Sequence, residues 1–572
     1  MFCKGFCDTA RYVMGSFVKF MKKRFDVFFL CFGAMVMLCV LVANFIALRN
    51  NVIFSDESWY LCLLRDLPHH GAVRFQHLFF NVFDNDIYLI RLFCWSLQLM
   101  GDVVFSVCVC VYVTAFDFSL QKNDVMKNGW ALASLVLLCA LYFGKMRIVS
   151  CPSLNYNTLK VIFAEFSIGF LLVGLTKQKV FWYVVSGFFV GVLFASMITS
   201  VILLPFLFAL IVILSSHKWR DSLGLLIGLL LFCFYYFFLE SPKDVMMSVV
   251  TMTNKVVNLG SSDYGIVFLI KWVVDAFMYL GKCFFVATAL YCCYFVFYCK
   301  DFVSSNKKVK LCFWVLVSSF VLLWSWMYFE PVTPSGKVRN AFWARDLYWE
   351  LVFVLLLLMA HEKTIVPKEL WILLSFLLIF PICLSFGSNV PFYSHNEVLF
   401  FVTLVMVYLM LKQSFVKKVV VTVVLVLQFV LFLYGLSGKN WDGNKFFGNH
   451  IPVETIGIHQ SINLEEAQIK ELEVCRQIIP QGKILNSAGC WGMVCLLDYT
   501  PVSYEFAIDR NDANYIRTVV DDVVREDGHL WVVSHTWENN GTDGLVDKVL
   551  SLSGYEVVAD TIDEVVFVHV SQ

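Results

Sequence analysis

Long apolar runs separated by short basic stretches are the main pattern along most of this chain. A membrane-spanning helix needs about 20 mainly apolar residues, and about thirteen runs approach that length. These runs cover residues 26–48, 87–115, 130–143, 156–176, 180–195, 199–214, 223–239, 276–298, 311–329, 347–360, 370–386, 398–411 and 419–436. The pattern predicts a polytopic α-helical membrane protein.

The lysines and arginines between the runs indicate how the chain crosses the membrane. If the N-terminus is cytoplasmic, every inner loop carries Lys or Arg, as cytoplasmic loops do. Runs 180–195 and 199–214 could instead form one long broken helix, because both are short and "SMITS" interrupts them. If the two runs are separate spans, Lys179 and Lys218 both lie on the cytoplasmic side. We therefore predict a helical hairpin over residues 180–214. We expect the first run to be an uncleaved signal anchor and the C-terminus to lie outside.

After residue 436 the composition becomes more polar, which divides the chain into a transmembrane domain, residues 1–436, and a soluble domain, residues 437–572. "NLEEAQIKELEVCRQII" and "TDGLVDKVLSLSG" predict helices, whereas "KILNSA", "HLWVVSH" and "YEVVADTIDEVVFVHVS" predict strands. The soluble domain is therefore expected to be α/β. It has no phosphate-binding glycine loop and no metal-ligand spacing, which favours an accessory binding or lid role outside the membrane.

Composition adds two constraints to this picture. The chain has 572 residues, of which 59% are hydrophobic, and its formal net charge is zero, so no basic field points to nucleic acid. Most of the 20 cysteines lie inside apolar runs, where they pack as small hydrophobic groups. The predicted outer side, where a disulfide can persist, holds Cys62, Cys151, Cys475, Cys490 and Cys495. The disulfide that we consider would join two of the cysteines within the C-terminal tail.

The candidate chemistry lies in the first outer loop, where "SDESWYLCLLRDL" places Asp56 beside Glu57. Two adjacent carboxylates next to a membrane cost solvation free energy, so they either begin a helix in water or take part in chemistry. Arg65 and Asp66 in the same stretch predict a local ion pair. The "DND" at 84–86 directly precedes an apolar run, and this position favours helix capping over metal binding.

This stretch resembles the start of the first outer loop in the GT-C superfamily of membrane glycosyltransferases. The similarity is greatest to the branch that contains the lipid A aminoarabinose transferases and the protein O-mannosyltransferases. The matching positions are Asp56, Glu57, Tyr60 and Arg65, and "NDIYLIRLFCWSLQLMG" resembles the start of the family's second span at Arg91 and Leu92. The predicted number of spans, the inside N-terminus and the outside C-terminal domain are also similar to that branch.

The resemblance implies a GT-C-like transmembrane domain and an inverting transfer of one sugar on the extracytoplasmic face of a membrane, expected to be the bacterial inner membrane. The donor would be a polyprenyl-phosphate-linked sugar, and the acceptor a lipid-linked or cell-surface glycan such as lipopolysaccharide; a protein acceptor is less favoured. Asp56 would act as general base. Glu57 would orient the acceptor or a divalent metal ion, although no metal-ligand set is assigned.

The expected reaction needs both a base and cations. A carboxylate must take the proton of the acceptor hydroxyl, and positive groups must stabilise the charge that grows on the departing lipid phosphate. The candidate substrate-binding residues are Arg74, His77, Arg147, Asn155, Asn157, Lys337, Arg339 and Arg345. Turn formation explains Asn155 and Asn157 equally well. Gln76 and His77 stand where the family has an acidic residue and Lys-Pro, and we read the neighbouring His69 and His70 as polar surface rather than metal ligands.

Two other function classes fit the same spans. A transporter or flippase of lipid-linked sugars would place its polar residues near the midplane of broken helices, and the acidic pair in a loop favours the enzyme over it. Glu165, inside the fourth run, predicts a polar contact within the bundle. A glycan polymerase would carry paired arginines in large outer loops. Arg147, Arg339 and Arg345 are spread over the predicted outer loops, so the polymerase stays an alternative.

Overall fold

The computed structural model describes residues 33–46, 48–50, 56–67, 73–83, 86–116, 154–248, 277–289, 367–385, 450–454, 461–479, 483–486, 491–502, 513–535, 545–562 and 565–572, with a few isolated positions. Apart from one isolated position, the predicted spans 130–143, 311–329, 347–360, 398–411 and 419–436 lie outside these residues. The total of about thirteen spans therefore stays a prediction.

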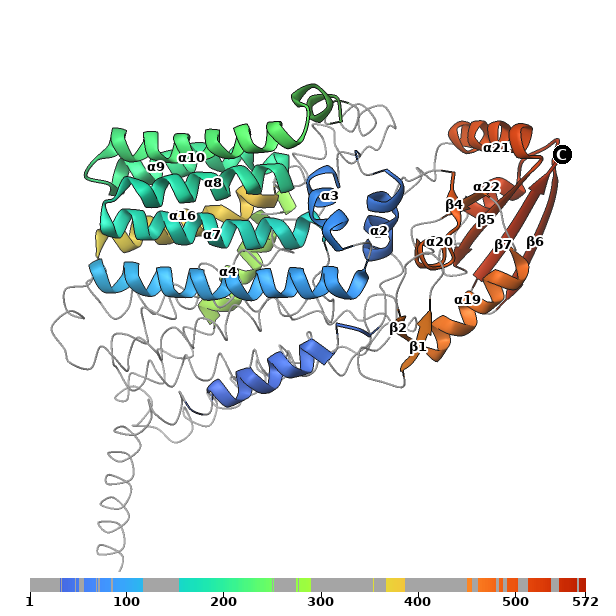
Figure 1. The fold of residues 1–572 in the computed structure, drawn as a ribbon, viewed down its shortest axis with the longest axis horizontal. Coiled ribbons are helices and arrows are strands. Elements are labelled where there is room, and N and C mark those ends of the chain that lie inside the picture. Colours follow the sequence, from blue (N-terminus) through green and yellow to red (C-terminus); the bar gives the residue numbers. More distant parts are fainter. Residues whose placement is uncertain are drawn as a thin grey trace, which may run out of the picture.

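Among the described residues, three helices are long and apolar enough to cross a membrane: α4 (Ile87–Phe116), α7 (Tyr156–Lys177) and α10 (Lys218–Leu239). They lie side by side in one bundle (Figure 1) with α8 (Val180–Ser196), α9 (Leu203–Leu214) and α16 (Lys368–Ser385). Shorter apolar helices cover Gly33–Ile46 and Phe277–Ala289. The apolar runs predicted at these positions are confirmed as helices.

The predicted hairpin between residues 180 and 214 is confirmed. α7 ends where Gln178 takes a left-handed φ of 53°, and α8 begins two residues later. The chain leaves along α8, turns through the short 3-10 helix η2 (Ile198–Ile202) and returns along α9. The hydroxyl of Ser216, after α9, then donates to Gln178 Oε1 at 2.7 Å. Lys179 and Lys218 consequently lie at the same end of the bundle.

Glycines allow α8 and α10 to pack with their backbones almost touching. Gly187 and Gly191 on α8, and Gly224 and Gly228 on α10, each have the small-xxx-small spacing found at helix contacts in membranes. A Cβ added to Gly228 would lie 1.9 Å from the carbonyl oxygen of Val184, and one added to Gly187 would lie 2.0 Å from that of Leu225. No side chain larger than hydrogen fits at either position.

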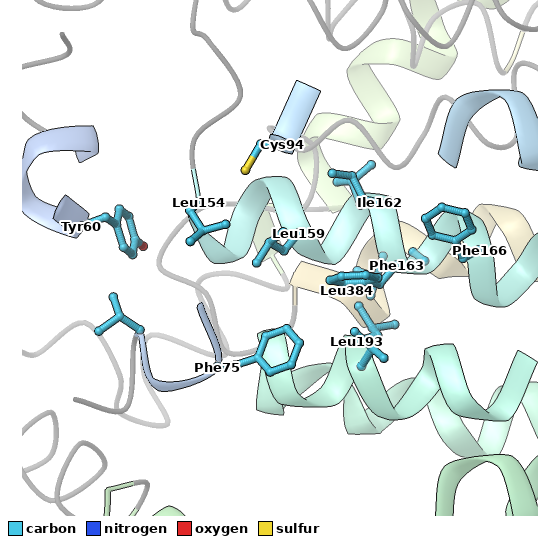
Figure 2. Close-up of a cluster of buried hydrophobic side chains, with 14 of the residues drawn as sticks. Tyr60, Phe75, Cys94, Leu154, Leu159, Ile162, Phe163, Phe166, Leu193 and Leu384 are labelled. Carbon is cyan, nitrogen blue, oxygen red and sulfur yellow. The ribbon is translucent and has the colours of Figure 1, made fainter. Parts of the chain in front are cut away.

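Helix α3 (Arg74–Phe80) packs onto the end of this bundle. Figure 2 shows Phe163 of α7 close to Leu193 of α8 and Leu384 of α16, and all three side chains are buried. Phe75 of α3 is also buried, with its ring centroid 6.3 Å from that of Phe163. The segment between the first apolar helix and α4 therefore shares the apolar core of the helix bundle.

The C-terminal region contains a mixed sheet, as the predicted α/β domain requires. Its five strands have the order β4-β3-β5-β7-β6, in which β3 pairs in parallel with β4 and β5, and β7 pairs antiparallel with β5 and β6. The strands are β3 (Lys483–Asn486), β4 (Thr500–Pro501), β5 (His529–His535), β6 (Glu556–Ile562) and β7 (Val565–Ser571). A separate antiparallel pair is formed by β1 (His450–Glu454) and β2 (Ser461–Glu465).

Helices cover both faces of this sheet. α21 (Ala513–Asp527) and α22 (Leu545–Leu550) enclose one core, in which Val520 and Val549 meet Val568. On the opposite face, Val533 belongs to the cluster that contains Trp491 of α20 (Trp491–Leu496). The predicted helix near 463–479 is confirmed as α19 (Glu466–Ile478), and the helix predicted up to residue 554 is shorter and ends with α22. α20 and α21 were not predicted.

Candidate functional site

The acidic pair forms the beginning of α2 (Asp56–Asp66), which lies between the helix bundle and the C-terminal domain (Figure 1). Carboxylates in the first turn of a helix interact favourably with the helix dipole. The side chain of Asp56 lies outside the described part of the chain, whereas that of Glu57 is buried. The predicted helix start is therefore confirmed, and the catalytic role of Asp56 stays a prediction.

Glu57 forms a buried bidentate ion pair with Arg91 of α4. Arg91 Nε donates to Glu57 Oε1 at 2.8 Å, and Nη2 donates to Oε2 at 2.6 Å. The side chains are 3% and 1% exposed, respectively. Arg91 Nη1 also donates to the carbonyl oxygens of Leu48 at 2.9 Å and Asn50 at 3.3 Å. One guanidinium thus joins α2, α4 and the segment that follows the first apolar helix.

Arg74, a predicted phosphate-binding residue, forms a second buried ion pair. Its Nε donates to Glu240 Oε2 at 2.9 Å, and the two side chains are 7% and 10% exposed. Glu240 directly follows α10, so the pair connects α3 to the end of α10. Glu240 was not predicted, because its distance of 166 residues from Arg74 leaves no local pattern.

His77 and Gln76 lie next to this ion pair on α3. The rings of His77 and His69 are 6.1 Å apart, and no cluster of three or more potential metal-ligating residues is found in the described ranges. Gln76 is 1% exposed, and within the described part of the chain its Nε2 has no hydrogen-bond partner. Gln76 therefore has a buried amide donor available in the loop where this chain differs from the resembled family.

The two predicted asparagines at the start of α7 differ in what they bind. The Asn155 side chain caps the helix, because its Oδ1 accepts from the backbone N–H of Thr158 at 2.8 Å. Asn157 Oδ1 is buried, and no donor among the described residues reaches it.

Asp86 caps α4 by accepting from the N–H of Leu89 at 2.9 Å, which confirms the predicted capping. The remaining candidates that lie outside the described residues are His70, Arg147, Lys337, Arg339 and Arg345.

Charged groups are also buried inside the bundle. Asp102 of α4 and Lys160 and Glu165 of α7 are each 0% exposed. A Cβ on Gly101 would lie 2.6 Å from Glu165 Oε2, so the Glu165 carboxylate reaches the surface of α4. Glu165 is therefore buried against a neighbouring helix, and the polar contact that the sequence predicts for it stays a prediction.

The C-terminal domain contacts α2 directly. Arg65 Nε donates to Asp66 Oδ1 at 2.6 Å, which confirms the predicted local pair, and Arg65 Nη1 donates to Asp498 Oδ1 of the C-terminal domain at 2.9 Å. The N–H of Asn463 on β2 donates to the carbonyl oxygen of Arg49 at 3.0 Å. The helix that begins with the acidic pair is therefore held from both sides, by the bundle and by the C-terminal domain.

The burial of His77 predicts a loss of stability at mildly acidic pH. Burial lowers the pKa of the His77 imidazole, the nearby His69 lowers it further, and Glu240 opposes them. Since the folded-state pKa lies below the unfolded value of about 6.5, stability is full above that pH and falls as the pH drops through the folded pKa. Between pH 7.5 and 5 we expect the Tm of the wild type to fall more than that of His77→Gln. Changing the exposed His217 to Gln should leave the wild-type pH dependence unaltered.

The sequence matches no protein-family model, and the search of curated proteins finds no match for it either. The likeness to the GT-C glycosyltransferases consequently rests on the first-loop motif and on the arrangement of the apolar runs.

Proposed function

We propose that this chain is a membrane glycosyltransferase of the GT-C type. It transfers one sugar, with inversion, from a polyprenyl phosphate to a lipid-linked or cell-surface glycan on the extracytoplasmic face of the bacterial inner membrane. Asp56 takes the proton of the acceptor hydroxyl while that oxygen bonds to the anomeric carbon and the bond to the lipid phosphate breaks. Attack from the face opposite the phosphate inverts the anomeric centre.

The observation that carries this proposal is the buried ion pair between Glu57 and Arg91. It fixes the first turn of α2 against the start of α4, at the end of the bundle and beside the C-terminal domain. A general base is efficient only when its position is fixed within hydrogen-bonding reach of the proton it removes. The pair therefore supplies the rigid support that a base at position 56 requires.

Glu57 has a positioning role in this proposal. Both of its carboxylate oxygens accept hydrogen bonds from Arg91, so they do not fit the role of metal ligands. The proposed reaction therefore includes no step that depends on a divalent ion at Glu57. In the same way, Glu240 already balances the charge of Arg74, which leaves Arg147, Lys337, Arg339 and Arg345 as the cations proposed for the lipid phosphate.

Two buried amide atoms are suited to the sugar. Gln76 Nε2 and Asn157 Oδ1 have no hydrogen-bond partner within the described ranges, and buried polar groups are normally paired. One is a donor and the other an acceptor, which is the combination that sugar hydroxyl groups satisfy. Gln76 follows the "RF" of the first outer loop, so it belongs to the part of the chain where substrate preference is expected to depart from the resembled family.

Replacing Asp56 with Asn tests the proposal. The asparagine keeps the size of the side chain but cannot accept the proton, and general-base catalysis contributes about 10²–10⁴-fold to a rate. We expect transfer from synthetic polyprenyl-phosphate sugars to purified lipid-linked glycan to fall at least about 100-fold, with an unchanged Tm. Asp66→Asn on the same helix is the matched control, and we expect it to retain the wild-type rate. Undiminished transfer by folded Asp56→Asn would refute the base assignment.

A transporter or flippase of lipid-linked sugars is a second candidate, which the buried charges in the bundle favour. Asp102, Lys160 and Glu165 lie inside membrane-spanning helices, where transporters place the residues that carry ions or substrate. Detergent-solubilised protein separates the two functions, because an enzyme turns over without separate compartments. Formation of glycosylated product in micelles supports the transferase. If no donor sugar yields product, whereas reconstituted vesicles move lipid-linked sugar across the bilayer, the transporter is correct.

A further inference from the structure

Two cysteines meet where α2 packs against α20 of the C-terminal domain. Cys62 is 0% exposed and Cys495 is 2% exposed, and both are thiols in the structure. The two helices that carry them pack against each other, and the Cys62 and Cys495 thiols lie close enough to interact. Both side chains belong to the apolar cluster that continues from the bundle into the C-terminal domain.

The surrounding contacts hold these two helices in a fixed relation. Arg65, one turn after Cys62, contacts Asp498 at 2.9 Å and the carbonyl oxygen of Tyr499 at 3.4 Å, and both residues follow α20 closely. The Tyr499 hydroxyl in turn donates to the carbonyl oxygen of Ile479 at 2.8 Å. A polar network on one side and apolar packing on the other therefore hold α2 and the segment around α20 together.

We propose that Cys62 and Cys495 form a disulfide in the native protein, which covalently joins the first outer loop to the C-terminal domain. This inference rests on the extracytoplasmic location that we propose for both segments, since disulfides persist in oxidising compartments. A disulfide joins two sulfur atoms about 2 Å apart and requires Cα atoms no more than about 7 Å apart, a separation that residues on two packed helices can have.

The bond forms by thiol–disulfide exchange with a protein disulfide of an extracytoplasmic oxidoreductase. One thiolate attacks that disulfide, and the second then attacks the resulting mixed disulfide. Overall, two thiols and one oxidoreductase disulfide give one new disulfide and one oxidoreductase dithiol, so electrons and protons balance. Burial raises the pKa of the Cys62 thiol well above its usual range. Once the helices have packed, the thiol is a poor nucleophile, and the exchange therefore takes place during folding.

Cys475 provides a matched control from the same domain. It is 0% exposed, and its Sγ lies 3.1 Å from Met493 Sδ rather than next to another cysteine. The pair considered within the tail stays a prediction, because Cys490 lies outside the described residues. Replacing Cys475 removes a buried thiol from the same apolar cluster and leaves both cysteines of the proposed bond in place.

The test uses the full chain with a specific protease site inserted within residues 437–449, the predicted junction between the two domains, and with a tag at the C-terminus. Membranes are collected in N-ethylmaleimide, which blocks free thiols, then cleaved and separated on denaturing gels with and without reductant. We expect the tagged tail to remain attached to the membrane part until reductant is added. Cys62→Ser and Cys495→Ser should each release the tail without reductant, whereas Cys475→Ser should retain the linkage.

Two outcomes would overturn the proposal. In one, the wild-type tail is released without reductant, and a linkage appears only after copper phenanthroline is added, which means that the thiols are adjacent but reduced in the cell. In the other, the tail is released even after that oxidant, which means that the two thiols are not adjacent.

Cleavage of intact spheroplasts by external protease tests the extracytoplasmic location separately. If the tail is cut from outside yet not linked, only the disulfide fails; if it is protected, the proposed location fails as well.

Discussion

Replacing Glu57 with Gln is expected to lower the free energy of unfolding by about 3–5 kcal/mol, the usual cost of removing one partner from a buried ion pair. The Arg91 side chain is 1% exposed, so its positive charge would stay in an apolar site without the carboxylate that balances it. Denaturant or thermal unfolding of the purified protein in detergent measures the change. Transfer activity should fall as well, because the first turn of α2 loses its anchor to α4.

Two further variants separate this effect from the mere loss of a charge. Glu466→Gln removes a carboxylate that pairs with Lys470 at 3.2 Å on the surface, where the side chains are 69% and 66% exposed, and it should cost less than about 1 kcal/mol. Glu57→Leu combined with Arg91→Met removes both buried charges and should recover part of the lost stability. Recovery should be incomplete, since the carbonyl oxygens of Leu48 and Asn50 lose their donor. Wild-type stability of Glu57→Gln would show that the pair is not buried.

Features that depend on local composition were predictable from the sequence. The start of α7 at Tyr156 and the extent of α8 follow directly from the apolar runs, because a membrane-spanning helix satisfies its own backbone hydrogen bonds and needs no partner to define it. The hairpin of α8 and α9 could be inferred from Lys179 and Lys218, since basic residues in short loops remain on one side of the membrane.

The candidate site could be predicted only in part, because its contacts join residues far apart in the chain. Arg91 is 34 residues from Glu57, and Asp498 is 433 residues from Arg65. Neither distance produces a period or a motif that one sequence can reveal. Consequently, the motif identified Glu57 but not the ion pair that holds it, and the C-terminal domain was expected outside the membrane without its contact to α2.

Some of the unpredicted features did have a signal in the sequence. In α21, Ile516, Val520, Val523 and Val524 are buried at helical spacing, and the sequence "ANYIRTVVDDVVRED" shows that period clearly. The paired glycines of α8 and α10 also have a recognisable spacing. Strand β4, with two residues, has no such signal because its pairing with β3 depends on the neighbouring strand.

Replacing Gly228 with Ala is expected to lower the free energy of unfolding by about 3 kcal/mol or more, at the upper end of the cost of overpacking. The new methyl group would lie 1.9 Å from the carbonyl oxygen of Val184, a backbone atom that cannot rotate away. α8 and α10 would have to separate, and the contacts along both helices would weaken together. Gly187→Ala should have a similar effect, because its Cβ would lie 2.0 Å from the carbonyl oxygen of Leu225.

Gly281→Ala is the matched control, and it should not destabilise the protein. Gly281 lies in the helix Phe277–Ala289, and a Cβ there would meet nothing within 4 Å in the described structure. Alanine favours a helix over glycine by about 1 kcal/mol, so Gly281→Ala should be neutral or stabilising. The same helix propensity acts at Gly228, which means that a destabilised Gly228→Ala protein reports steric overlap alone. Equal Tm values for Gly228→Ala and Gly281→Ala would mean that α8 and α10 do not approach so closely in the membrane.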